Sequence, residues 1–122
     1  MKRPSRDEER EQRITMESIV DAYTPEEQAM GWYYSLEDQL HFPFVARCIA
    51  QRSISPLRVG DEVEVVGMAP EAECQHEMFV LICWEHRPLA LPLAQLEGVA
   101  VEEQTRQAIE DWQYWVEQGY EL

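Results

Sequence analysis

Two adjacent acidic residues, Glu37 and Asp38, lie at the end of a predicted helix and are candidates to bind a cation. Proline disfavours helical geometry in the residue before it, so Pro43 predicts that this helix ends near Leu40 or His41. The last helical turn carries the negative end of the helix dipole and several unpaired carbonyl oxygens. Such a concentration of oxygen suits a hard cation such as calcium. Because exposed acids are common, the local pattern alone favours two solvated side chains.

A second group of acids lies in the middle of the chain. Between residues 59 and 86 there are seven acidic residues and no lysine or arginine, so ion pairs within this segment cannot neutralise it. Glu71 and Glu73, in a predicted loop, and Glu77, at the start of a predicted strand, are the candidate metal ligands here. The alternative, which the segment alone favours, is an acidic rim that keeps the protein in solution.

Other metal and catalytic motifs find little support in the sequence. The EF-hand pattern D-x-[DN]-x-[DN]-G occurs nowhere. Cys74, His76, Cys83 and His86 have the ligand types of a zinc site, but C-x-H is an unusual zinc spacing. Cys83 also lies in an apolar strand, where a buried thiol is the ordinary expectation. Since neither a G-x-S-x-G motif nor a glycine-rich phosphate loop is present, we expect no enzymatic activity.

The composition limits the partners. The chain has 122 residues and a net charge of -14, so nucleic acid and anionic membranes should be repelled, whereas cations and basic proteins should be attracted. An acidic interaction module that docks on a basic protein is therefore the alternative to a calcium-binding protein. Three cysteines without a C-x-x-C spacing indicate reduced thiols and a cytoplasmic location. No apolar run resembles a signal peptide or a membrane span.

The helix that carries Glu37 and Asp38 has clear start signals. Thr24 can cap it, Pro25 suits its first position, and Glu27 completes a capping box. Its predicted buried stripe consists of Ala29, Tyr33, Leu36 and Leu40. Gly31, inside this helix, either permits the close approach of another backbone or leaves room for the neighbouring aromatic residues.

The remaining pattern predicts one domain. Residues 1–13 are expected to form a frayed, charged segment, and residues 14–122 a single acidic calcium-binding domain. Ser5 and Glu8 have capping-box spacing, so a first helix is predicted from there to Asp21. A last helix follows from the spacing of Ile109, Trp112, Trp115 and Val116, whose tryptophans are expected in the core.

Between these helices the spacing of apolar residues changes from the three or four of a helix to the two of a strand. Four short strands are predicted near residues 42–51, 62–65, 78–84 and 88–93. The third is apolar on both faces and should be central, whereas the prolines beside the fourth suit an edge strand. We therefore predict an α+β fold: a small SH3-like, bent antiparallel sheet or barrel with two N-terminal helices and one C-terminal helix.

Taken together, these segments resemble the CcbP family, calcium-binding proteins of cyanobacteria and other bacteria. The resemblance covers residues 14–122. It rests on TPEEQAMGWYY (24–34), LED (36–38), FPF (42–44), SPL (55–57), GD (60–61), VGMAP (66–70), EC (73–74), EMFV (77–80), LPL (91–93), WQYW (112–115) and GY (119–120). Each piece is short, and the combination is specific.

The resemblance implies an acidic α+β protein that binds Ca2+ without an EF-hand. In this family the LED segment is associated with the metal, which corresponds to Glu37 and Asp38 here. The resemblance also implies intracellular sequestration or sensing of calcium, linked in some members to heterocyst differentiation. Glu71, Glu73 and Glu77 are not implied by the resemblance and remain candidates on electrostatic grounds.

Overall fold

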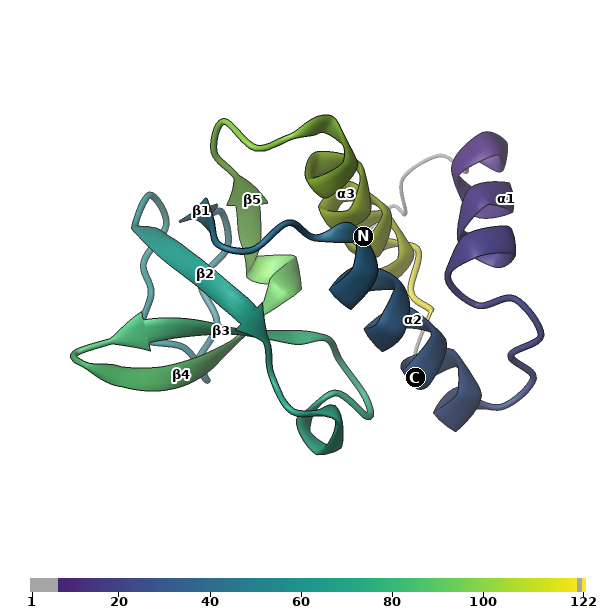
Figure 1. The fold of residues 1–122 in the computed structure, drawn as a ribbon, viewed down its shortest axis with the longest axis horizontal. Coiled ribbons are helices and arrows are strands. Elements are labelled where there is room, and N and C mark those ends of the chain that lie inside the picture. The colour runs from purple at the N-terminus through teal and green to yellow at the C-terminus, as the bar shows by residue number, and fades with distance from the viewer. Residues whose placement is uncertain (1–6, 121) are drawn as a thin grey trace.

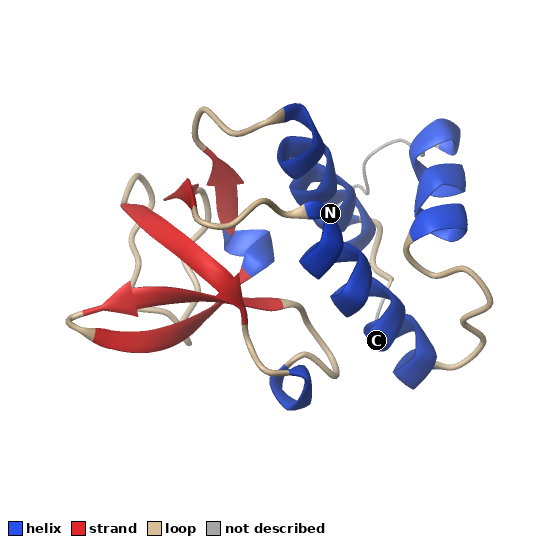
Figure 2. Cartoon of the chain, viewed as in Figure 1, coloured by secondary structure: helices blue, strands red, loops and turns tan. Residues whose placement is uncertain are grey.

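The strands and the α-helices occupy separate sides of the molecule (Figure 2). The computed structural model describes residues 7–120 and 122. It has three α-helices, five strands and two short 3-10 helices, so the predicted α+β class is confirmed. In chain order these are α1 (Glu8–Glu17), α2 (Pro25–Gln39), β1 (Phe44–Cys48), β2 (Glu62–Met68), η1 (Glu71–Glu73), β3 (Phe79–Trp84), β4 (Arg87–Pro92), η2 (Leu93–Gln95), β5 (Leu96–Gly98) and α3 (Glu103–Glu117).

The five strands form one antiparallel sheet in the order β4-β3-β2-β1-β5 (Figure 1). As predicted, β4 lies at an edge and β3 pairs on both sides. The sequence pattern missed β5, because three residues that follow a 3-10 helix show no alternation of their own. The expected burial of Cys83 is wrong: this residue, near the end of β3, is exposed, whereas Val80 and Ile82 on the same strand are buried.

Helix α2 follows its sequence signals closely. The Thr24 hydroxyl accepts a hydrogen bond from the Glu27 amide at 3.1 Å, and Pro25 is the first helical residue. The helix ends at Gln39, with Leu40 as its C-cap, close to the end predicted from Pro43. All four residues of its predicted apolar stripe are buried. The carboxylates of Glu37 and Asp38 are therefore in the last turn, as expected.

Helix α1 is shorter than predicted. Its N-cap is Asp7, which accepts a hydrogen bond from the Arg10 amide at 3.0 Å, and the predicted cap Ser5 lies outside the described residues. The helix ends at Glu17, and the chain turns before Asp21, which has a positive φ of 57°. The domain boundary predicted at residue 14 therefore falls inside α1.

An aromatic cluster joins α2 to α3. The ring of Trp32 lies edge-on to those of Trp112 and Trp115, with centroids 5.0 and 5.7 Å apart. All three side chains are buried, which confirms the predicted core role of the two α3 tryptophans. Helix α3 also packs on η2 and β5, so the cluster ties the helices to the sheet. Within the described residues, no helix combines the length and the apolar character that crossing a membrane requires.

Gly31 allows the chain after α1 to approach the backbone of α2. A Cβ atom at this position would lie 2.3 Å from the carbonyl oxygen of Ser18, so the structure confirms the close-approach interpretation. The neighbouring hydroxyls of Ser18 and Ser35 are 3.0 Å apart. The contact fixes the segment that leads from α1 into α2.

We expect Gly31→Ala to destabilise the protein by about 2 kcal/mol. Overpacking against a backbone carbonyl costs up to about 3 kcal/mol, which outweighs the gain in helix propensity of about 1 kcal/mol. Urea unfolding measures the difference. The matched control is Gly67→Ala, because a Cβ there meets nothing within 4 Å and should leave stability nearly unchanged. A Gly31→Ala variant as stable as the wild type would contradict the close contact.

Candidate metal site

The C-terminal end of α2 presents carbonyl oxygens without their usual helical partners. The amide of His41 would normally bond to the carbonyl of Glu37, but it donates to the hydroxyl of Thr105 at 3.0 Å instead. Pro43 has no amide hydrogen with which to reach the carbonyl of Gln39. The last turn also contains no basic residue. The helix itself therefore contains nothing that offsets the negative potential at its C-terminal end.

The carboxylates of Glu37 and Asp38 add to this potential. Both side chains are exposed, and among the described residues neither forms a hydrogen bond or an ion pair. Residues three and four apart share a face of a helix, so Tyr34 lies on the same face as both acids. The two carboxylates are thus free to accept a cation.

Two successive tyrosines of α2 hold the segment that carries the next acids. The buried hydroxyl of Tyr33 donates to the carbonyl of Ala69 at 2.7 Å. The hydroxyl of Tyr34, which is more exposed, donates to the carboxylate of Glu71. Glu71 is the first residue of η1, so these contacts bring η1 against the last turns of α2. The sequence pattern places Glu71 and the pair at the helix end in separate groups, whereas in the structure Glu71 contacts Tyr34, one helical turn before Glu37 and Asp38.

The charges of Glu37 and Glu71 both act on the hydroxyl of Tyr34. The hydrogen bond to Glu71 raises the pKa of the Tyr34 hydroxyl above its ordinary value, and the charges on Glu71 and Glu37 add to this effect. Burial raises the pKa of Tyr33, and the negative charge of Glu37 raises it further. Both tyrosines therefore lie within the field of both carboxylates.

The other two candidate ligands differ in their surroundings. Glu73, at the end of η1, is exposed and has no ion-pair partner among the described residues. Glu77 accepts two hydrogen bonds from the guanidinium of Arg52, at 2.9 and 3.0 Å. Arg52 lies outside the arginine-free segment, so the composition of that segment could not indicate this pair. Glu77 is thus already neutralised and is the least suited of the five candidates.

The donor set fits calcium, although the site is not assembled in advance. Among residues 7–120 and 122, no three histidine, cysteine or acidic side chains lie close enough together to hold a metal ion. Carboxylate and carbonyl oxygens are the ligands that Ca2+ prefers, and its coordination geometry is flexible. Exposed glutamates on α2 and η1 can move toward an ion, and water can fill the remaining positions.

A zinc site is not supported by the arrangement of the cysteines. Cys74 is buried, and burial raises the pKa of its thiol, which disfavours the thiolate that zinc requires. Cys83 is exposed near the end of β3. In the described part of the chain these two cysteines form no metal-ligand cluster with histidine.

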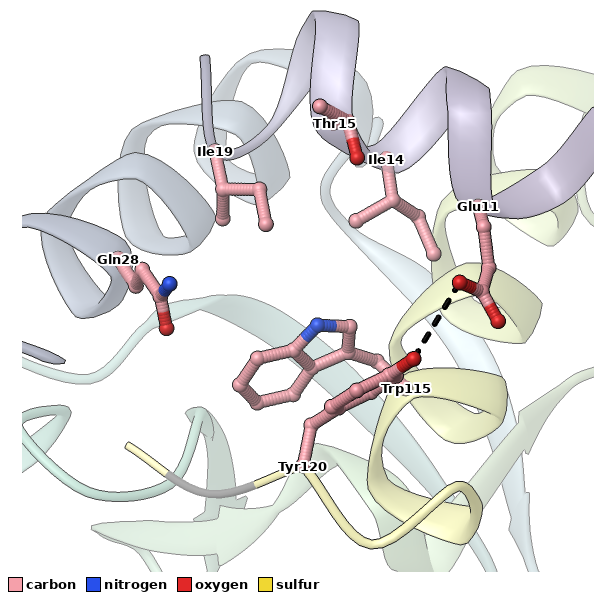
Figure 3. A pocket seen from close by; sticks show the side chains of 7 residues that line it. All are labelled: Glu11, Ile14, Thr15, Ile19, Gln28, Trp115 and Tyr120. Carbon is pink, nitrogen blue, oxygen red and sulfur yellow. Dashed lines mark hydrogen bonds between the residues drawn. The ribbon is translucent and has the colours of Figure 1, made fainter. Parts of the chain in front are cut away.

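A pocket of about 250 Å³ lies elsewhere, where α1 and α2 meet α3 and the C-terminal segment (Figure 3). Glu11 is its acidic member, and its carboxylate accepts hydrogen bonds from the hydroxyls of Tyr114 at 2.6 Å and Tyr120 at 3.3 Å. Ile14, Ile19 and Trp115 supply apolar walls. The lining of this pocket includes a single carboxylate, whereas the end of α2 carries two, so the end of α2 remains the better metal site.

Sequence reasoning placed Tyr33 in the buried stripe and assigned no role to Tyr34. A signal for Tyr34 was nevertheless present, because it precedes Glu37 and Asp38 by one helical turn and is displaced from the buried stripe. Its partner in the folded chain, Glu71, is 37 residues away, so no local pattern could have identified the contact.

Comparison with known proteins also points to calcium binding. Residues 12–116 match the family model of calcium-binding proteins of the CcbP type. The crystal structure of Anabaena CcbP is 41% identical, covers 98% of each chain and superimposes with a TM-score of 0.86. A structure described as a calcium-binding protein in its calcium-binding form is 40% identical, covers 96% of each chain and has a TM-score of 0.84. A search of curated proteins found no match.

Proposed function

The chain belongs to the CcbP family of calcium-binding proteins, and from this premise we propose that it binds Ca2+ at the C-terminal end of α2. Glu37 and Asp38 supply the carboxylates on the helix, and Glu71 and Glu73 supply those on η1. The observation that carries this proposal is the contact between Tyr34 and Glu71, because it brings a second acidic segment to a helix end that already lacks positive charge.

The mechanism is electrostatic. Without calcium, the acids at this end of α2 repel one another and face the negative end of the helix dipole. A divalent cation relieves that repulsion and gains carboxylate and carbonyl ligands. Mg2+ demands a near-octahedral arrangement and loses its water reluctantly, so an adaptable, hydrated site on two elements favours calcium. Because the ligands must be gathered, we expect weak to intermediate affinity.

The biological role proposed for this binding is sequestration or sensing of calcium in the cytoplasm. The net charge of -14 supports it, because such a surface concentrates cations around the protein. A link to heterocyst differentiation rests on the family resemblance alone.

The same net charge also favours a second candidate function, an acidic module that docks on a basic protein. The two functions differ in their response to divalent ions. Docking driven by net charge should respond equally to calcium and magnesium at matched ionic strength, whereas a calcium site should distinguish them.

Calcium titration of the wild-type protein in excess magnesium tests the proposal. We expect saturable heat of binding and a rise in melting temperature at fixed ionic strength, because a ligand that binds only the folded state stabilises it. At a free calcium concentration of 100 times Kd, the stabilisation should be about 2.7 kcal/mol. If calcium produces neither effect beyond that of magnesium, the chain does not have a selective site and the docking function becomes the better candidate.

A further inference from the structure

The Tyr34 hydroxyl is the point at which α2 contacts an acidic side chain of η1. Among the described residues, the carboxylate of Glu71 has this hydroxyl as its one hydrogen-bond partner. The backbone carbonyl of Glu71 is held separately, by the amide of Cys74 at 2.9 Å and the side chain of Gln75 at 3.0 Å. The phenol therefore orients the Glu71 carboxylate, whereas local hydrogen bonds hold the backbone of η1.

We propose that Tyr34 is a positioning residue of the calcium site, which holds the Glu71 carboxylate beside Glu37 and Asp38 and thereby raises calcium affinity. This inference rests on the proposed function. Tyr34 itself is not assigned as a ligand, and its effect is exerted through Glu71.

The physical reason is preorganisation. A free glutamate side chain loses rotamer freedom when it binds an ion, and a side chain that is already oriented loses less. One hydrogen bond from a phenol leaves the carboxylate several further acceptor positions, so the contact does not block a metal. Partners that orient metal ligands change affinity by about 10- to 100-fold when they are removed.

Tyr34→Phe tests the inference, since it removes the hydroxyl and keeps the ring. We expect calcium to bind about tenfold more weakly in excess magnesium. Because Tyr34 is 52% exposed, the melting temperature of the calcium-free protein should change little. Tyr23→Phe is the matched control: Tyr23 is 83% exposed, its hydroxyl has no hydrogen-bond partner among the described residues, and the same change there should leave affinity unaltered.

A double-mutant cycle shows whether the effect passes through Glu71. We expect Glu71→Ala to weaken calcium binding and Tyr34→Phe to have no further effect in that background. Hydrogen exchange without calcium gives an independent readout: in Tyr34→Phe the amide of Cys74, bonded to the Glu71 carbonyl, should exchange as in the wild type, because local hydrogen bonds hold the backbone of η1.

Several results would overturn the inference while leaving calcium binding intact. The first is a Tyr34→Phe variant that binds calcium as tightly as the wild type or more tightly. The second is a loss of affinity on Tyr34→Phe that is as large in the Glu71→Ala background as in the wild type. The third is a Glu71→Ala variant with wild-type affinity. Absence of selective binding by the wild type would instead overturn the proposed function itself, so the two failures are distinguishable.

Discussion

Asp38→Asn is expected to weaken calcium binding by about 100-fold. The substitution keeps the shape of the side chain and one oxygen ligand, so the loss of calcium affinity measures the contribution of the negative charge. At a calcium–oxygen distance of about 2.4 Å, one negative charge attracts a divalent cation by about 3 kcal/mol in a water-like dielectric. This energy corresponds to about two orders of magnitude in Kd. Calorimetric titration in excess magnesium is the measurement.

The same substitution should have the opposite effect on the calcium-free protein. Asp38 faces the negative end of the α2 dipole, and no basic residue lies in the last turn. Removing its charge should therefore stabilise the calcium-free fold by about 0.5 kcal/mol. Weaker binding together with a higher melting temperature before calcium is added would distinguish a lost ligand from general damage to the fold.

Asp21→Asn is the matched control for Asp38→Asn. It changes the net charge equally, it is exposed, and its positive φ of 57° is a conformation that asparagine adopts readily. We expect calcium affinity close to that of the wild type. If both substitutions weaken binding equally, calcium responds to the overall charge and not to a site at the end of α2. If Asp38→Asn leaves affinity unchanged, Asp38 is not a ligand.

Asp111→Asn is expected to produce the largest loss of stability, about 3 kcal/mol. The Asp111 side chain is 7% exposed, and it joins α3 to α1. It accepts hydrogen bonds from the guanidinium of Arg10 at 2.9 Å and from that of Arg13 at 2.6 and 3.0 Å. Removing one member of a buried ion pair leaves the opposite charge uncompensated, which costs about 3–5 kcal/mol. Because both arginines remain partly in contact with solvent, the lower value applies.

Urea unfolding measures this loss, and Glu110→Gln provides the neighbouring control. Glu110 contacts Arg106 at 3.0 Å and Arg10 at 3.7 Å, but its side chain is 41% exposed. Exposed ion pairs contribute about 0–1 kcal/mol, so this change should be mild. Equal effects of the two substitutions would show that the burial of Asp111 is unimportant. A further variant that replaces Arg10, Arg13 and Asp111 with apolar residues should recover stability, because no buried charge is then left unpaired.

The contrast between Glu71 and Glu77 shows where prediction from the sequence reached its limit. Both are acids in the same arginine-free segment, and composition could not rank them. In the fold, Glu71 meets a tyrosine of α2, whereas Glu77 meets Arg52. One carboxylate is therefore oriented with its charge intact, and the other is neutralised. The difference arises from partners 37 and 25 residues away, respectively.

Local chemistry determined the parts of this protein that the sequence predicted well. Thr24 and Pro43 define the limits of α2, Thr24 through capping and Pro43 through the non-helical geometry it favours in the residue before it; both effects act within about one helical turn. The position of Glu37 and Asp38 in the last turn follows directly, as does the negative charge of the surface.

Only the tertiary structure decided which residues from other parts of the chain contact α2. The pairing of β5 with β1, the approach of Ser18 to Gly31 and the contact of Tyr34 with Glu71 each connect residues far apart in the chain. Such contacts depend on how the helices and the sheet pack together, and they leave no periodic pattern in the sequence. The sequence therefore determined where an acidic helix end would form, and packing decided which other acidic side chain contacts that helix.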